Sequence, residues 1–216
     1  MASDKRLDIP FVSNPGNGCA LACYTMAAKH FFPETTFEQI AELSDWKPGY
    51  VVWGFRFRNW MLQQGFSVRH IEDLDYKQWA NEGVDGLRKA VPQHEFEYYM
   101  EHTYDLNLCV EQIQKMFSYD NFSFELRRPS WEDVLTSHNN NEVCTLTIDA
   151  AILDNKEGCL PHAIILLNID AIKNEVTIHD PRGKKNARPH RKETIKQLCR
   201  SFENHDGAEL VTYKKI

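Results

Sequence analysis

The first part of the chain carries apolar side chains with the period of an α-helix. Small and apolar residues recur every three or four positions in CALACYTMAAKHF, between a glycine turn and Pro33, which predicts a helix over 19–31. Thr36 and Gln39 form a capping box that begins a second helix, which extends to about residue 43. The pattern predicts a third helix over 52–64, and it stays helical from about residue 75 to residue 117.

Most of the remaining chain shows the alternation that is typical of β-strands. Runs rich in β-branched and aromatic residues predict strands over 66–71, 122–128, 142–150, 162–169, 175–180 and 209–214. Strands 162–169 and 175–180 are separated by the turn DAIKN and should form a hairpin. Ser130 and Asp133 begin a helix with a second capping box, and another helix is expected over 192–202. Helices followed by an antiparallel sheet predict an α+β fold.

Composition and charge narrow the class of protein. A chain of 216 residues that is 42% hydrophobic and 12% aromatic should fold around one core. Its net charge of −6 provides no basic face, so no nucleic-acid partner is expected. No segment approaches the ~18 apolar residues of a membrane span, so we expect no membrane partner and a cytoplasmic location. The basic run over 182–192 is interpreted as a solvated loop, with a site for an acidic substrate group as the alternative.

The six cysteines are too few for a disulfide framework in a chain of this length. Most of them are expected to be buried packing residues. Cys19 differs, because the first turn of a helix offers free backbone N–H groups and the positive end of the helix dipole, which favour a thiolate. Cys23 lies one turn further along the helix, where this effect has faded, and is expected to belong to the core.

A thiol nucleophile needs a base, and the base needs a group that orients it. His162 begins the most hydrophobic strand of the chain, and Asp180 ends the next strand. A hairpin brings the start of its first strand beside the end of its second, so His162 and Asp180 should lie together. His179 is the second candidate for the base, but alternation along the strand directs it to the face opposite Asp180. The pattern therefore predicts a triad of Cys19, His162 and Asp180.

Other kinds of site find less support. The nine histidines show no HExxH or CxxC spacing, so no metal site is expected. The loop NPGNG lacks the Lys and Ser/Thr of a phosphate-binding loop, and no cofactor is expected. The aromatic clusters over 46–60 and 95–104 are interpreted mainly as core packing, with the lining of a substrate groove or a partner contact as the alternative.

Three motifs together resemble the papain-like cysteine peptidases, most closely the bacteriocin-processing type that cuts after double-glycine leaders. These motifs are CALACYTM, PHAIILLNID and VTIHDPRG. In that family the nucleophile helix often begins C-G-L-A-C-x-x-M, a later strand begins with the His of an HxVVL-like segment, and the next strand ends in Asp-Pro. The resemblance covers roughly residues 9–31 and 129–213. It implies one papain-like domain over 1–216, in which N-terminal helices pack on a C-terminal antiparallel sheet and residues 72–125 form a helical insertion.

Carried over residue by residue, the resemblance implies Cys19 as nucleophile, His162 as general base and then acid, and Asp180 as the residue that orients His162. Two positions differ from the family. Ala20 replaces the glycine that follows the nucleophile, which is a mild change within a helix. The glutamine of the family's oxyanion hole is absent. Asn14 has the same amide donor on a shorter stem and is the candidate for this role, together with the backbone N–H of Cys19.

These residues predict a thiol hydrolase that acts on an amide or peptide bond of a peptide or protein substrate. Proteolysis, glutamine deamidation and acyl transfer use the same groups, and neither the choice among them nor the oligomeric state follows from the sequence. The alternative is a catalytically silent papain-like module that binds a peptide, because the oxyanion glutamine is missing. A transferase acting on thiol peptides is a weaker third hypothesis, since it would need a cluster of metal-responsive cysteines.

Overall fold

The computed structural model describes residues 6–14, 16, 18–182 and 187–216. Over these ranges the chain forms ten helices and seven strands, which confirms a mixed α+β composition. The helices are α1 (Cys19–Phe31), α2 (Phe37–Leu43), α3 (Phe55–Gln63), α4 (Tyr76–Glu82), α5 (Val84–Ala90), α6 (Gln93–His102), α7 (Leu106–Phe117), α8 (Trp131–Asn139), α9 (Ala150–Leu153) and α10 (Ile195–Glu203). The strands are β1 (Phe66–Glu72), β2 (Phe122–Leu126), β3 (Val143–Asp149), β4 (Pro161–Asp170), β5 (Glu175–Asp180), β6 (Arg188–Thr194) and β7 (Glu209–Lys215). No helix among these described residues is long and apolar enough to cross a membrane.

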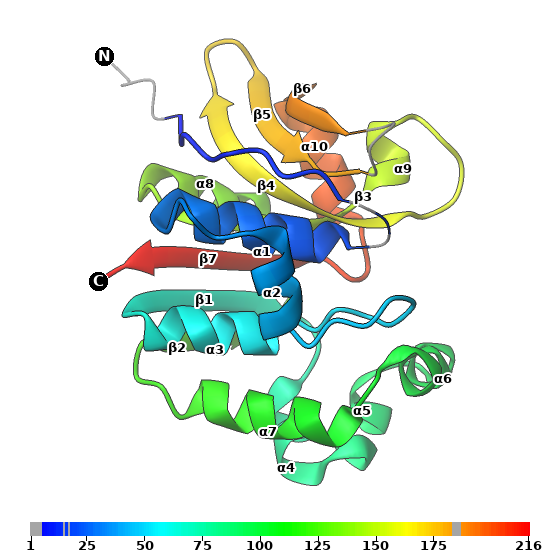
Figure 1. Ribbon diagram of the computed structural model, residues 1–216. Helices are drawn as coiled ribbons and strands as arrows, with labels where there is room; N and C mark the ends of the chain where they lie inside the picture. Colours follow the sequence, from blue (N-terminus) through cyan, green and yellow to red (C-terminus); the bar gives the residue numbers. More distant parts are fainter. Residues whose placement is uncertain (1–5, 15, 17, 183–186) are drawn as a thin grey trace.

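The strands of the described residues form one sheet in the order β2-β1-β7-β3-β4-β5-β6 (Figure 1). The C-terminal strands β3–β7 pair antiparallel, as expected. The sheet is not wholly antiparallel, however, because β1 and β2 extend it and pair parallel to each other. The cause is the connection between them: α4–α7 carry the chain back from the end of β1 to the start of β2, and a parallel pair requires such a crossover.

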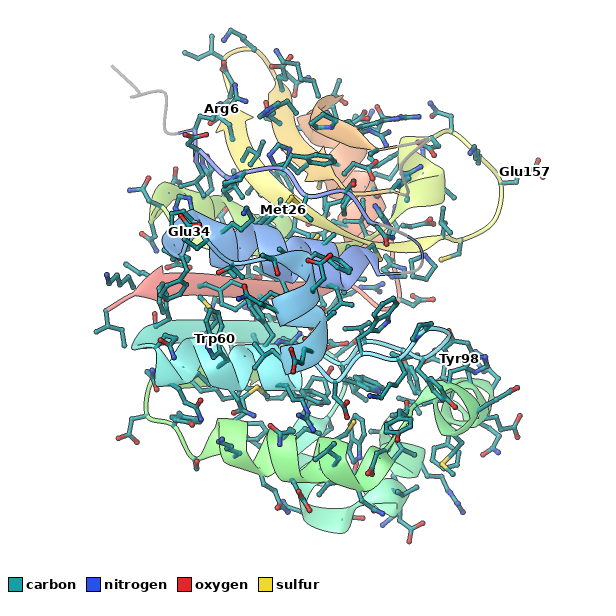
Figure 2. The ribbon with its side chains drawn as sticks, viewed as in Figure 1. Arg6, Met26, Glu34, Trp60, Tyr98 and Glu157 are labelled. Carbon is teal, nitrogen blue, oxygen red and sulfur yellow. The ribbon has the colours of Figure 1, made fainter. Side chains whose placement is uncertain are left out.

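Helices cover both faces of the sheet. α1 and α3 lie on one face, and α8 and α10 lie on the other (Figure 1). Because side chains alternate along a strand, Ile165 of β4 joins the core that contains Met26, whereas Ile164 joins the core that contains Phe202. Met26 of α1 is fully buried and is labelled in Figure 2. The apolar side of α1 thus fixes this helix against the sheet.

Both predicted capping boxes are present. The Thr36 hydroxyl accepts the backbone N–H of Gln39, and the Gln39 side chain accepts the backbone N–H of Thr36. Ser130 and Asp133 form the same reciprocal pair at the start of α8. These local hydrogen bonds explain why the two helices begin where the sequence indicates.

The third helix begins three residues later than predicted. The N–H of Val51 donates to the carbonyl of His102 at 2.7 Å, which keeps this segment outside the helix. At Gly54, a Cβ atom would lie 2.5 Å from the hydroxyl oxygen of Tyr24. The close approach of α1 therefore requires glycine directly before α3.

The helical pattern expected from about residue 75 to residue 117 is confirmed by α4–α7. These helices bring aromatic side chains against those of the 46–60 cluster. The ring centroid of Trp53 lies 5.5 Å from that of Phe55, 5.0 Å from that of Trp79 and 4.9 Å from that of Tyr99. Phe55 and Trp79 are buried, so core packing accounts for this part of the aromatic content.

The interpretation of the basic run over 182–192 as a solvated loop is wrong for the residues that the structure describes. Arg188–Thr194 forms the edge strand β6, which pairs with β5, and α10 begins at Ile195 instead of residue 192. Arg191 is buried in ion pairs with Asp180 and Asp154. Residues 183–186 lie outside the described residues. Part of the basic run therefore points into the protein, because the buried carboxylates of Asp154 and Asp180 form ion pairs with Arg191.

Candidate active site

An extended N-terminal arm, residues 6–14, crosses β4 and β5 on the face that carries α1 (Figure 1). The N–H of Leu7 donates to the carbonyl of Leu167 at 3.0 Å, and the N–H of Asn14 donates to the carbonyl of Pro181 at 2.8 Å. Pro181 directly follows Asp180. The arm therefore places Asn14 next to the end of β5.

The side chain of Asn14 holds the loop that leads into α1. Its Oδ1 atom accepts the backbone N–H of Gly16 at 2.8 Å and that of Gly18 at 2.9 Å. Asn14 is only 4% exposed. Gly18 is the N-cap of α1 and Cys19 is its first residue, as predicted. The amide of Asn14 thus lies beside the backbone that leads into Cys19.

β4 and β5 form the predicted hairpin, and the hairpin brings His162 to Asp180. His162 lies at the start of β4, and Asp180 ends β5. The Nε2 atom of His162 lies 2.8 Å from Oδ1 of Asp180. Both side chains are buried, Asp180 completely. The second ring nitrogen of His162 is left for Cys19, with which His162 shares a side-chain hydrogen bond.

These contacts shift the pKa of all three groups. Burial raises the pKa of the Cys19 thiol, but the hydrogen bond and charge of His162, with the backbone N–H groups of Ala163 and Ala20, bring it below its usual value of 9.0. Burial lowers the pKa of His162, but Asp180 and Cys19 raise it to about 9. Burial raises the pKa of Asp180, but the hydrogen bond to His162 lowers it to about 2. The site therefore favours a thiolate, an imidazolium and a carboxylate in contact.

The other five cysteines lack this environment. Cys23 is fully buried in the core, as predicted, and burial raises its pKa well above the usual value. Burial also raises the pKa of the remaining four, which are Cys109, Cys144, Cys159 and Cys199. All six cysteines lie in the described ranges and are free thiols. Cys19 is thus the one thiol whose pKa lies below its ordinary value.

His179, the second candidate for the base, binds the N-terminal arm instead. Its Nε2 atom donates to the carbonyl of Ile9 at 2.8 Å, and its Nδ1 accepts the N–H of His190 at 3.1 Å. Its ring packs edge-on against Phe11, with centroids 5.1 Å apart. Burial lowers the pKa of His179 to about 4. These contacts anchor the arm on the face of β5 opposite Asp180.

Asp180 has two cationic partners that the sequence reasoning missed. Nη1 of Arg191 lies 2.8 Å from Oδ2 of Asp180, and Nε of Arg182 lies 3.2 Å from the same oxygen. Both arginines also pair with Asp154. The available signal was the basic run itself, but nothing in its spacing indicates that Arg182 and Arg191 turn inward.

A second buried polar cluster lies at the same end of the sheet and was also missed. Nε2 of His70 lies 3.0 Å from a carboxylate oxygen of Glu72 and 3.0 Å from one of Glu209. Arg58 pairs with Glu209, and its Nη1 lies 3.2 Å from Nδ1 of His70. A guanidinium can only donate, so Nδ1 of His70 accepts and its proton lies on Nε2, between the two carboxylates. Although ligand atoms of all three residues lie within 4.8 Å of one another, this tautomer fits a hydrogen-bond network better than a metal site.

The arrangement around Cys19 can perform nucleophilic chemistry. A thiolate beside an imidazolium can attack an electrophilic carbon, and the imidazolium can then protonate the leaving group. A carboxylate on the far side of the ring keeps the proton-carrying nitrogens in place. Cys19 keeps part of its surface exposed, which an attacking group needs.

No model of a protein family and no curated protein matches this chain. Among solved structures, it is similar to a double glycine motif protease from an AMS/PCAT transporter in complex with the leader peptide. That match has a TM-score of 0.49 and 11% sequence identity, and it covers 98% of this chain and 94% of the other. The chain is also similar to the peptidase domain of Streptococcus ComA, a bi-functional ABC transporter involved in a quorum sensing pathway, with a TM-score of 0.44, 11% identity and coverage of 96% and 97%. The first of these structures is a double glycine motif protease, the type of peptidase that the sequence motifs resemble, and the second is a peptidase domain.

Proposed function

We propose that this protein is a thiol hydrolase with a papain-like fold, acting on an amide or peptide bond of a peptide or protein. In this proposal Cys19 is the nucleophile, His162 the general base and then acid, and Asp180 the residue that orients His162. The proposed domain extends over residues 1–216, and the segment 72–125, which contains α4–α7, is its helical insertion. No cofactor takes part in this chemistry.

The observation that supports this function best is the continuous contact of three groups. Cys19 shares a hydrogen bond with His162, and Nε2 of His162 lies 2.8 Å from Oδ1 of Asp180. The direction of the pKa change at Cys19 agrees with it, since this is the one cysteine in which the thiolate is favoured. Such a combination of contact and charge is what a thiol nucleophile needs at neutral pH.

The proposed reaction has two halves. The thiolate of Cys19 forms a bond to the carbonyl carbon, and the imidazolium of His162 transfers its proton to the amine as the C–N bond breaks. Water then gives a proton to His162 and attacks the thioester, which releases the acid and restores the thiolate. If an amine replaces water, the product is a new amide, so acyl transfer needs the same residues.

The oxyanion of each tetrahedral intermediate needs hydrogen-bond donors. The N–H of Cys19 is the first of α1 and has no partner within the helix. Oδ1 of Asn14 is turned toward Gly16 and Gly18, so Nδ2 is the donor that remains on this side chain. We propose these two N–H groups as the oxyanion hole. Loss of one such donor typically costs about 10²–10³ in rate.

A peptide-library digest tests the proposal. The wild type, Cys19→Ala and the matched control Cys199→Ala are incubated with the library, and mass spectrometry detects cleaved, deamidated and ligated products. Cleavage by the wild type and by Cys199→Ala, but not by Cys19→Ala, is the expected result. Cleavage that persists in Cys19→Ala would assign the activity to another site.

The alternative, a catalytically silent module that binds a peptide, makes a different prediction. Such a module does not need an activated thiol, so Cys19 should react with alkylating agents no faster than other exposed cysteines. The lowered pKa of Cys19 favours the hydrolase over this alternative.

A further inference from the structure

We propose that Arg191 is a positioning residue of the active site, which holds the carboxylate of Asp180 in the orientation that His162 requires. This inference rests on the proposed function, because it concerns the residue that orients the base. It adds a residue from the edge strand β6 to a site otherwise built from the N-terminal arm, α1, β4 and β5.

The guanidinium of Arg191 is bound on every nitrogen. Nη1 lies 2.8 Å from Oδ2 of Asp180, and Nη2 donates to the carbonyl of Leu153 at 3.0 Å. Nη2 also lies 3.2 Å from Oδ1 of Asp154, and Nε donates to Oε1 of Glu193 at 2.5 Å. Arg191 is 8% exposed, so these contacts are made largely away from water. A planar group bound on three sides is rigid and can orient its partners.

Arg182 completes a ring of alternating charges. It pairs with Asp154 through Nη1, and its Nε lies 3.2 Å from Oδ2 of Asp180. The ring therefore runs from Asp180 through Arg191, Asp154 and Arg182 back to Asp180. Its four side chains are 0%, 6%, 5% and 13% exposed in that order. Two buried carboxylates thus face two buried guanidinium groups. Without Arg191, Asp180 would keep only Arg182 and His162 as charged partners.

The two oxygens of Asp180 have separate tasks. Oδ1 lies 2.8 Å from Nε2 of His162, and Oδ2 lies 2.8 Å from Nη1 of Arg191. Rotation of the carboxylate about its Cβ–Cγ bond would break one contact or the other. Arg191 therefore fixes the plane in which Oδ1 meets His162, and through it the direction of the ring nitrogen that faces Cys19.

The test measures the rate at which iodoacetamide alkylates Cys19 across a range of pH. In Arg191→Met, the midpoint of this profile should move to higher pH, because a poorly held Asp180 no longer supports the imidazolium beside the thiolate. Below the midpoint, the rate should fall about tenfold for each unit by which the pKa of the thiol rises. Arg191→Lys keeps the positive charge but loses the planar set of N–H donors of the guanidinium. The midpoint of its alkylation profile should therefore lie between those of Arg191→Met and the wild type.

Arg188→Met is the matched control. Arg188 lies on the same strand and 3.6 Å from Asp154, but its side chain is 50% exposed, and among the described residues its ion pair is with Asp154 and not with Asp180. The same substitution at this position should leave the midpoint unchanged. A shift as large as that of Arg191→Met would overturn the proposal, because it would show that any charge lost from this strand has the same effect.

A double-mutant cycle separates positioning from general support of the fold. If Arg191 acts through Asp180, Arg191→Met should add nothing to the shift already produced by Asp180→Asn. Additive shifts, or an unchanged midpoint in a folded Arg191→Met, would overturn the proposal. If Arg191→Met does not fold, an unchanged midpoint in Arg191→Lys overturns it instead. A wild type whose Cys19 is unreactive refutes the proposed function itself, whereas a reactive wild type with unaffected Arg191 variants refutes this inference alone.

Discussion

Replacement of Asp180 by asparagine should uncouple His162 from Cys19, although the two side chains have the same shape. Asp180 accepts on both oxygens, from His162 on Oδ1 and from Arg191 on Oδ2. If the single oxygen of asparagine faces His162, its NH₂ group meets the guanidinium, which can only donate. If the oxygen faces Arg191, the NH₂ group meets Nε2 of His162, and the ring must carry its proton on Nδ1. That nitrogen can then no longer accept a proton from Cys19.

The contacts of His162 set the size of this effect. Burial lowers the pKa of His162, but Asp180 first and then Cys19 raise it from 6.5 to about 9. Loss of the Asp180 contribution should lower the pKa of His162, and each unit of that lowering shifts the equilibrium between the thiolate–imidazolium pair and the neutral pair about tenfold toward the neutral pair. The wrong tautomer adds to this loss, and in serine hydrolases with a triad the same substitution lowers kcat by about 10⁴. We therefore expect Cys19 alkylation near neutral pH to fall, by up to about tenfold for each unit by which the pKa of His162 is lowered, and peptide cleavage to fall much further.

Two assays and one control make this prediction decisive. Mass spectrometry gives the alkylation rate of Cys19 as a function of pH, and a cleaved library peptide gives kcat/KM. Asp170→Asn is the control, because Asp170 ends β4 at the far end of the hairpin and pairs with Lys173. A folded Asp180→Asn with the alkylation profile and kcat/KM of the wild type would refute the assignment of Asp180 as the orienting residue.

Three further predictions concern the oxyanion donor, pH and stability. Asn14→Asp keeps the acceptor that holds the loop but replaces Nδ2 by an oxygen, so kcat should fall about 10²–10³-fold at an unchanged melting temperature; a wild-type kcat would limit Asn14 to a role in the loop. Cleavage should rise as the pH passes the lowered pKa of Cys19 and fall as it passes about 9, where His162 loses its proton. A rate that keeps rising well above this pH would exclude the imidazolium as the acid. Arg58→Met removes the guanidinium that pairs with Glu209, so that this carboxylate keeps only its contacts with His70 and Thr147 in a largely buried cluster. The free energy of unfolding in urea should fall by about 3–5 kcal/mol; a loss below about 1 kcal/mol would place this pair among weak surface ion pairs.

The parts of the molecule that the sequence predicts well are those with local signals. α1 begins after a glycine turn and ends before Pro33, and both signals lie within the segment itself. The β4–β5 hairpin follows from two strongly apolar runs and a five-residue turn, and the hairpin alone brings His162 to Asp180. The orientation of His179 follows from alternation along one strand. Local patterns therefore sufficed to bring together two members of the candidate triad.

The parts that the sequence did not predict depend on pairing between distant segments. β6 reads RPHRKET, a polar sequence without an apolar alternation, which is common in edge strands because charge protects an exposed edge. Its strand character comes from pairing with β5. The cluster of His70, Glu72 and Glu209 forms because β1 and β7 are neighbours in the sheet, although they are separated by most of the chain. In the same way, Arg191 has a role at Asp180 only once β6 lies beside β5.

The central claim is that Cys19 is an activated nucleophile, and competition among the six cysteines tests it most directly. The wild type and His162→Ala are treated at neutral pH with less iodoacetamide than protein, and mass spectrometry counts the label on each thiol. Cys19 should take up most of the label in the wild type, well ahead of the exposed Cys159, and His162→Ala should remove this advantage. Equal labelling of Cys19 and Cys159 in the wild type, or an advantage of Cys19 that survives His162→Ala, would contradict the claim.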